Sequence, residues 1–316
     1  MLQMISYAMG CRLLAALDAT GPAAEAALAE VPGWFAAWER ALSRFRSDSE
    51  LVALNHQAGA GPMPVSATLW AVIGSSLEAA RLSGGLVTPT LLDALERAGY
   101  DRDFAALEHE ATAVRSGATR QTSSGDWRLV HLDAYRRAVT LPQGLRLDLG
   151  GFAKGWAADM AARRLKDIGP ALVDVGGDIA VSGPQTDGSP WPIAVADPLC
   201  PDEPLDLLLL HAGGVATSGR DYRRWRRGEL EGHHIIDPRS GEPAATDLLT
   251  ATVVAPSAQE AEAAAKAALI LGSDAGMAWL VARPHLAGLL LTESGRVVRT
   301  ATLDAYRWEA VEGGSA

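Results

Sequence analysis

Lysine is scarce in this chain of 316 residues: of its 28 lysines and arginines, only Lys154, Lys166 and Lys266 are lysines. Because an ammonium group is compact and a guanidinium is planar, a lysine retained among so many arginines indicates a position that needs the smaller cation. Cysteine is scarcer still, since Cys11 and Cys200 are the only two and belong to no Cys/His zinc pattern. Neither a disulfide framework nor thiol redox chemistry is expected.

The chain also lacks an excess of positive charge. Its formal net charge is -10 at pH 7, whereas proteins that bind nucleic acids present a basic surface to the phosphates. The basic residues of segment 220–227 are the one local exception. They form either a solvated loop or a patch for an anionic ligand or an acidic partner.

Long hydrophobic runs are absent as well. Residues 1–19 are largely apolar, but they have no basic start, and Arg12 and Asp18 interrupt them well before a bilayer-spanning length. We therefore expect a cytoplasmic protein without membrane insertion.

What is present is enough apolar sequence, 48% of residues, for a folded core. Helices are expected at 22–45 with a break at Pro32, 67–82, 91–98, 152–168 and 258–271. Strands are expected at 4–18, 127–132, 138–141, 145–149, 171–175, 179–182, 193–196, 207–210, 234–236 and 250–255. Helices at both ends with adjacent strands between them favour an α+β fold with largely antiparallel sheets. Segment 108–125 is expected to be loose, and the tail 313–316 disordered.

Residues 146–155, with the sequence RLDLGGFAKG, form the most informative segment. It predicts a strand ending in Asp148, a glycine pair, and a helix that begins beside Lys154. Glycines let a backbone approach a ligand, and a helix N-terminus supplies N–H groups and positive potential that suit a phosphate. A plain strand-turn-helix with a surface lysine is the alternative interpretation.

Two further segments carry polar groups beside glycines. Asp174 and Asp178 flank Gly176-Gly177, a combination that tight turns also use. Thr217 and Ser218 follow an apolar strand, where their hydroxyls either bind phosphate or cap a turn.

Segment 232–241, GHHIIDPRSG, contains paired histidines. If Ile235-Ile236 is buried, one histidine faces a cleft and the other faces away. His234 is our candidate general base near neutral pH, with Asp237 orienting it, and a structural histidine bonded to the backbone is the alternative.

Together these segments resemble the ApbE-type flavin transferases. The resemblance runs from Met9-Gly10 through Gly272, with short motifs in the family's order at 43–51, 54–55, 85–90, 148–155, 176–178, 216–219 and 234–241. It implies an α+β, T-fold-related protein of two lobes with an FAD cleft between them. Residues 1–272 would form the transferase domain of two interleaved lobes, and a helix and hairpin at 273–312 would complete it.

The resemblance also implies the site. The residues expected to bind FAD are Met9, Phe45, Leu86, Val87, Thr88, Asp148, Lys154, Thr217, Ser218 and Ile236. In many relatives an aspartate stands at the position of Thr88, so the contact there is expected to differ.

Family members also bind a divalent cation, usually Mg²⁺, and the matching positions here are Gly151, Glu262 and Lys266. Relatives typically have Asp and Thr at the last two positions. Because a charged lysine has no lone pair to offer a metal, we expect the Lys266 ammonium to occupy the metal's place, held by Glu262 four residues earlier on the helix. An ordinary Glu–Lys surface pair is the alternative.

The activity implied is that of an FAD:protein FMN transferase, which cleaves FAD, attaches FMN to a Thr or Ser of an acceptor protein and releases AMP. Two alternatives remain open at this point. One is an FAD diphosphatase, in which water replaces the hydroxyl, and the other is a protein that binds FAD without chemistry.

Overall fold

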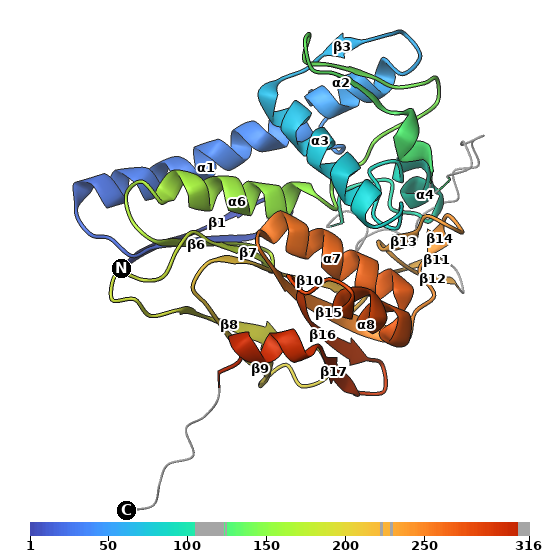
Figure 1. Cartoon of the computed structure of the whole chain (residues 1–316). Coiled ribbons are helices and arrows are strands. Elements are labelled where there is room, and N and C mark those ends of the chain that lie inside the picture. Colours follow the sequence, from blue (N-terminus) through green and yellow to red (C-terminus); the bar gives the residue numbers. More distant parts are fainter. Residues whose placement is uncertain (105–122, 124, 222–223, 228–229, 309–316) are drawn as a thin grey trace, which may run out of the picture.

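The computed structural model describes residues 1–104, 123, 125–221, 224–227 and 230–308 (Figure 1). The tail 313–316, and segment 108–125 apart from residues 123 and 125, lie outside the described residues.

An eight-stranded sheet runs through the middle of the molecule, and every neighbouring pair in it is antiparallel. The strands, in spatial order, are β1 (Leu2–Ala8), β2 (Cys11–Leu17), β6 (Ala171–Val175), β7 (Asp178–Val181), β10 (Gly213–Gly219), β15 (Leu248–Ala255), β16 (Ala287–Thr292) and β17 (Val297–Arg299). The expected α+β fold with antiparallel sheets is confirmed.

The first expected strand, 4–18, is two strands in the structure. The chain turns at Met9 and Gly10, whose φ angles are 51° and 69°. A positive φ reverses the chain within two residues, so β1 and β2 pair as a hairpin.

Four helices cover one face of this sheet (Figure 1). They are α1 (Pro22–Leu42), α6 (Ala153–Leu165), α7 (Ala258–Leu271) and α8 (Ser273–Val281). Helices α1 and α6 share a core with β2 and β6, and α7 and α8 share another with β15 and β16. The expected break at Pro32 is absent, and α1 continues through this residue. Val31 and Phe35, in the same part of the helix, are fully buried, and their packing holds the helix together.

The opposite face is covered by the hairpin β8 (Trp191–Ala196) and β9 (Pro204–Leu210), together with the 3-10 helix η2 (Ala301–Tyr306). Segment 273–308 therefore adds α8, β16, β17 and η2 to the same sheet and its two packed faces.

A second group of elements lies beyond one end of the sheet (Figure 1). Its helices are α2 (Glu50–His56), α3 (Ala67–Leu82), α4 (Leu92–Arg97) and η1 (Asp126–Leu129). Its strands are β3 (Met63–Pro64), β4 (His131–Asp133), β5 (Ala138–Thr140), β11 (Arg224–Arg227), β12 (Leu230–His233), β13 (Ile236–Asp237) and β14 (Glu242–Pro243). The expected strand 127–132 begins as η1, and only its end pairs with β5.

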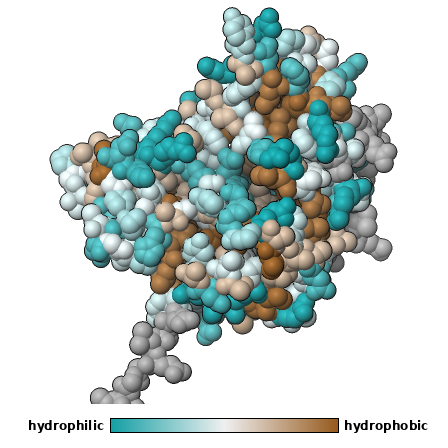
Figure 2. Space-filling view, viewed as in Figure 1, coloured by the Kyte–Doolittle hydropathy of each residue, from teal (hydrophilic) through white to brown (hydrophobic). Residues whose placement is uncertain are grey.

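The face shown in Figure 2 mixes hydrophilic residues with small groups of hydrophobic ones. Within the described ranges, no helix has the length and hydrophobicity required to span a bilayer.

Candidate active site

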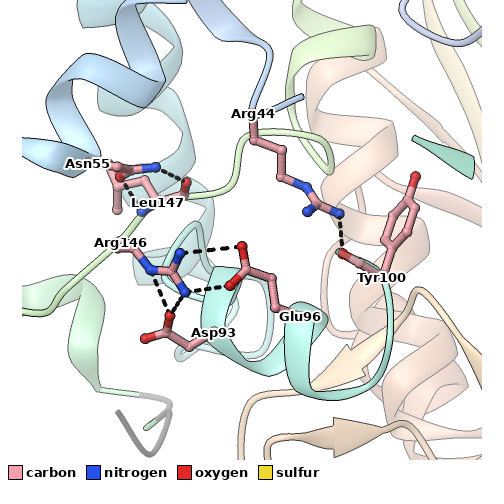
Figure 3. Close-up of polar contacts among 7 residues, drawn as sticks. All are labelled: Arg44, Asn55, Asp93, Glu96, Tyr100, Arg146 and Leu147. Atoms are coloured by element: carbon pink, nitrogen blue, oxygen red, sulfur yellow. Dashed lines mark hydrogen bonds and ion pairs between the residues drawn. The ribbon is translucent and has the colours of Figure 1, made fainter. Parts of the chain in front are cut away.

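The segment that leads into α6, residues 145–149, forms no regular secondary structure and is not the expected strand. Its leucines are buried, and its backbone pairs with a side chain instead of another strand. The Asn55 amide accepts from the N–H of Leu147 at 2.7 Å and donates to the carbonyl of the same residue at 2.9 Å (Figure 3). Because one side chain satisfies both backbone groups, no neighbouring strand is needed.

Charged side chains fix the other side of this segment. Arg146 forms ion pairs with Asp93 and Glu96 of α4 (Figure 3). The Asp148 carboxylate is 3.0 Å from the Arg44 guanidinium, and the Asp148 N–H donates to the carbonyl of Pro89 at 2.8 Å. The turn after Asp148 is thereby held from two directions.

Two of the residues expected to bind FAD, Phe45 and Ile236, meet in one aromatic cluster. The Phe45 ring lies 5.7 Å from the ring of Tyr100, which stacks on Trp225 at 5.4 Å. Ile236 is buried against this group. The Arg44 guanidinium lies over the Phe45 and Tyr100 rings, so the cluster adjoins Asp148.

The other expected contacts from the first half of the chain lie in turns. Thr88 is buried, and its hydroxyl is 2.9 Å from that of Thr90. Val87 packs into the core under α1, and Leu86 into the core under α7. Met9, in the β1–β2 turn, donates its N–H to Oε1 of Glu39 at 2.8 Å.

Helices α6 and α7 approach each other closely at Gly155. A Cβ on Gly155 would lie 2.8 Å from the carbonyl oxygen of Ala258, so no larger residue fits without separating the helices. Asp159 of α6 accepts hydrogen bonds from the first N–H groups of α7, at Ala258 (2.9 Å) and Gln259 (3.0 Å). This packing directs one face of α7 towards the beginning of α6.

Four charged side chains meet there, and we refer to Lys154, Asp178, Glu262 and Lys266 as the charge cluster. Lys154 forms an ion pair with Asp178. Oε1 of Glu262 is 3.5 Å from Nζ of Lys154 and 3.4 Å from Nζ of Lys266. The second Glu262 oxygen accepts the N–H of Gly155 at 3.0 Å. The two cations and two anions balance.

Burial shows that Glu262 and Lys266 are not a surface pair. The side chains of Glu262 and Asp178 are each 2% exposed, whereas those of Lys154 and Lys266 are 16% and 17% exposed. The carboxylates are therefore the inner layer of the cluster, and the ammonium groups lie nearer the surface.

The two carboxyl groups differ in their pKa. Burial raises the pKa of Asp178 to about 6, against the attraction of Lys154, and the negative charge of Glu262 adds to the rise. Burial also opposes the charge of Glu262, but the ammonium groups of Lys266 and Lys154 outweigh it and hold the pKa of Glu262 below its ordinary value. Glu262 is thus the charged anchor of the two lysines.

These residues do not fit a magnesium ion, which binds oxygen ligands in an octahedron. One Glu262 oxygen faces two ammonium groups and the other accepts a backbone N–H. Lys266 supplies N–H donors where a ligand oxygen would be required. Across the described residues, no group of three or more His, Cys, Asp and Glu side chains is placed to hold a metal.

Asp174 and Asp178, which look equivalent in the sequence, have different roles. Asp174 accepts the N–H of Gly177 at 2.7 Å and stabilises the β6–β7 turn, while Asp178 turns inward to Lys154. Thr217 and Ser218 lie within β10 and do not cap a turn. The Thr217 hydroxyl is 2.9 Å from that of Thr252 on the neighbouring strand.

The paired histidines occupy different environments. His233 ends β12 and is buried, with its ring nitrogens within hydrogen-bonding distance of the Ala244 carbonyl (3.2 Å) and the Ile235 N–H (3.3 Å). Burial lowers the pKa of His233. His234 is half-buried and lies in the gap between β12 and β13, so the expected strand 234–236 begins only at Ile236. The Asp237 carboxylate pairs with Arg239 at 2.7 Å.

Three residues with a part in this arrangement were not among the site residues expected from the sequence: Arg44, Asn55 and Asp178. Each belongs to a segment noted there for its motif. The residues that they contact are distant in the chain, so no local sequence pattern predicts these contacts.

The chain matches known proteins along most of its length. The model of the ApbE family matches residues 9–290. An FAD:protein FMN transferase of Treponema pallidum is 35% identical over 87% of this chain and 80% of its own, and one of Salmonella typhimurium is 30% identical over 82% and 75%.

Solved structures agree in fold. The ApbE protein of Thermotoga maritima superimposes with a TM-score of 0.83 at 23% identity, covering 98% of this chain and 99% of its own. The flavin transferase ApbE of Vibrio cholerae gives 0.79 at 20% identity, covering 96% and 98%. With a family match over most of its length and relatives at 30% identity and above, this chain belongs to the ApbE family.

Proposed function

We propose that this chain is an FAD:protein FMN transferase, the activity for which its Treponema and Salmonella relatives are named. FAD is the substrate, and the second substrate is an acceptor protein that offers a Thr or Ser hydroxyl. The observation that carries the proposal is the meeting of Lys154 and Lys266 beside the start of α6.

That arrangement suits a diphosphate. The first N–H groups of a helix have no partner within it and carry partial positive charge. α6 begins at Ala153 without a side-chain cap on Phe152, and the two ammonium groups lie within 3.5 Å of the same carboxylate oxygen. The N–H groups of Ala153 and Gly155 are already bonded to the Leu149 carbonyl and to Glu262, so phosphate oxygens bound here would meet chiefly the positive charge of the two lysines and of the helix N-terminus.

The reaction forms one bond and breaks one. The acceptor hydroxyl oxygen attacks the phosphorus of the FMN half of FAD, and the bond between that phosphorus and the bridging oxygen breaks. AMP leaves with the electron pair, and the hydroxyl proton passes to a base. Catalysis of such a transfer depends mainly on positioning and on neutralising phosphate charge.

In this scheme Lys154 and the α6 N-terminus neutralise charge, and His234 accepts the proton. His234 is the better candidate of the two histidines because both ring nitrogens of His233 lie against backbone groups. Asp237 holds Arg239, and its expected role in orienting His234 stays a prediction. The other residues expected to bind FAD remain our candidates for contacts to the rest of the molecule: Met9, Phe45, Leu86, Val87, Thr88, Asp148, Thr217, Ser218 and Ile236.

One incubation separates this function from its alternatives. The protein is mixed with FAD and a threonine-containing acceptor, and the products are followed by intact mass and nucleotide chromatography. Transfer predicts an FMN adduct on the acceptor with an equal amount of AMP. Free FMN with AMP would indicate a diphosphatase instead, and bound, unchanged FAD would indicate a binding protein.

A cytoplasmic location stays a prediction of this proposal. Magnesium, which the family resemblance implies, is not part of it, because the residues at the expected position do not fit the ion.

A further inference from the structure

Two of the three lysines in the chain meet at a single carboxylate oxygen. Nζ of Lys154 and Nζ of Lys266 lie 3.5 Å and 3.4 Å from Oε1 of Glu262, although one comes from α6 and the other from α7. Lys166, the third lysine, is exposed at the far end of α6. The scarce ammonium groups are therefore concentrated at one point.

Lys266 also lies against the turn that precedes α6. A Cβ on Gly151 would be 3.0 Å from Cε of Lys266 and 3.6 Å from its Nζ. The lysine side chain therefore packs directly against the backbone at Gly151. That is the backbone expected to face a phosphate.

The cluster is layered so that its positive charge is presented outward. The two carboxylates are almost fully buried, and the ammonium groups are several times more exposed. The contacts of Lys266 with the carboxylate and the carbonyl of Glu262 are both 3.4 Å long, at the long limit for a hydrogen bond. Such contacts exchange readily for a shorter bond to an anionic oxygen.

We propose that the Lys266 ammonium takes the place of the divalent cation at the diphosphate of FAD, so that FAD binding and FMN transfer need no added metal. This inference rests on the proposed function. The buried Glu262 carboxylate holds Lys266 in position. Lys154 provides a second ammonium at the same carboxylate oxygen, and the Gly151 turn packs against the Lys266 side chain. A tethered single charge neutralises less than a divalent ion, so turnover is slow.

The first test uses the wild-type protein. FAD affinity, from flavin fluorescence, and FMN transfer are measured after treatment with EDTA and again with excess Mg²⁺. We expect both quantities to be the same in the two conditions. A Mg²⁺ titration by calorimetry in the presence of FAD is expected to give no binding heat.

Two variants and a control sharpen the result. Lys266→Met keeps an unbranched side chain, one atom shorter, and loses the charge. FAD affinity should fall by about 10- to 100-fold, the worth of a hydrogen bond from a charged donor. Lys266→Thr supplies an oxygen and removes one of the two ammonium groups that face Glu262, so its FAD binding should become dependent on Mg²⁺. The control, Lys166→Thr, makes the same lysine-to-threonine substitution at an exposed site. Its FAD affinity and metal independence should match those of the wild type.

The outcomes distinguish a failure of the role of Lys266 from a failure of the proposed transferase activity. Loss of FMN transfer with EDTA and its return with Mg²⁺ would overturn the role of Lys266 and leave the transferase intact. Metal-independent FAD binding that depends on Lys266, without transfer to any hydroxyl, would support the inference and contradict the transferase. FAD binding in neither condition would overturn both.

Discussion

The backbone N–H of Gly155, in the first turn of α6, donates a hydrogen bond to Oε2 of Glu262 on α7 over 3.0 Å. This bond joins the start of α6, our proposed phosphate site, to the residue whose carboxylate lies beside both lysines. It exists only because the helices cross at a glycine, where a Cβ would lie 2.8 Å from the Ala258 carbonyl.

Gly155→Ala is therefore expected to lower the free energy of unfolding by about 1–3 kcal/mol, the usual cost of overpacking. It should also weaken FAD binding, because Glu262 and the lysines move away from α6. The matched control is Gly33→Ala in α1, where the added Cβ meets nothing within 4 Å. Urea unfolding of both variants measures the difference, and equal stabilities would contradict the close packing at Gly155.

Asn55→Ala tests the hold on the segment before α6. It removes both hydrogen bonds to the buried backbone of Leu147, which should cost about 1–3 kcal/mol of unfolding free energy. FAD affinity should fall as well, because Asp148, a candidate FAD contact, directly follows Leu147. Arg136→Ala, which removes an exposed hairpin ion pair, is the control and should leave the thermal midpoint unchanged.

The buried His233 should make the protein less stable as the pH falls. Burial lowers its pKa below the ordinary 6.5, so the unfolded chain binds a proton at this site more readily than the folded protein. Its contribution to stability is present above the unfolded pKa and is lost as the pH falls below it. The thermal midpoint of the wild type should drop more than that of His233→Gln on acidification; parallel curves would contradict this.

The helix boundaries illustrate what could be predicted from local sequence. Ser66 caps α3 by accepting from Leu69, Ser257 caps α7 by accepting from Glu260, and Gly272 ends α7 with a positive φ. Each signal involves residues within one turn of each other. The expected helices 67–82 and 258–271 therefore match the structure.

The features that could not be predicted depend on distant partners. Segment 145–149 reads as a strand because its leucines alternate, yet its backbone is paired by Asn55, far earlier in the chain. Asp174 and Asp178 both flank the same glycine pair, and only the position of Lys154 distinguishes them. The helix spacing of Glu262 and Lys266 indicated a pair, but its burial depends on the packing of α7 against α6.

His234→Asn tests the proton acceptor of the proposed reaction. Asparagine keeps a polar side chain but does not accept a proton near neutral pH, so FMN transfer should fall by about 100-fold or more, within the range for loss of a general base. FAD should remain bound with the affinity of the wild type. Single-turnover transfer followed by mass spectrometry measures the rate, and a variant that transfers normally would remove His234 from this role.

The inferred site places the diphosphate of FAD between the Gly151 turn and the Lys266 ammonium. A crystal structure of the protein soaked with FAD and Mg²⁺ tests it directly, through the distance from Nζ of Lys266 to the nearest diphosphate oxygen. We predict a hydrogen-bonded distance of about 2.7–3.2 Å with no metal ion between the two atoms. A diphosphate bound elsewhere, or a metal ion bridging it to Glu262 with Lys266 displaced, would show that Lys266 does not replace the cation.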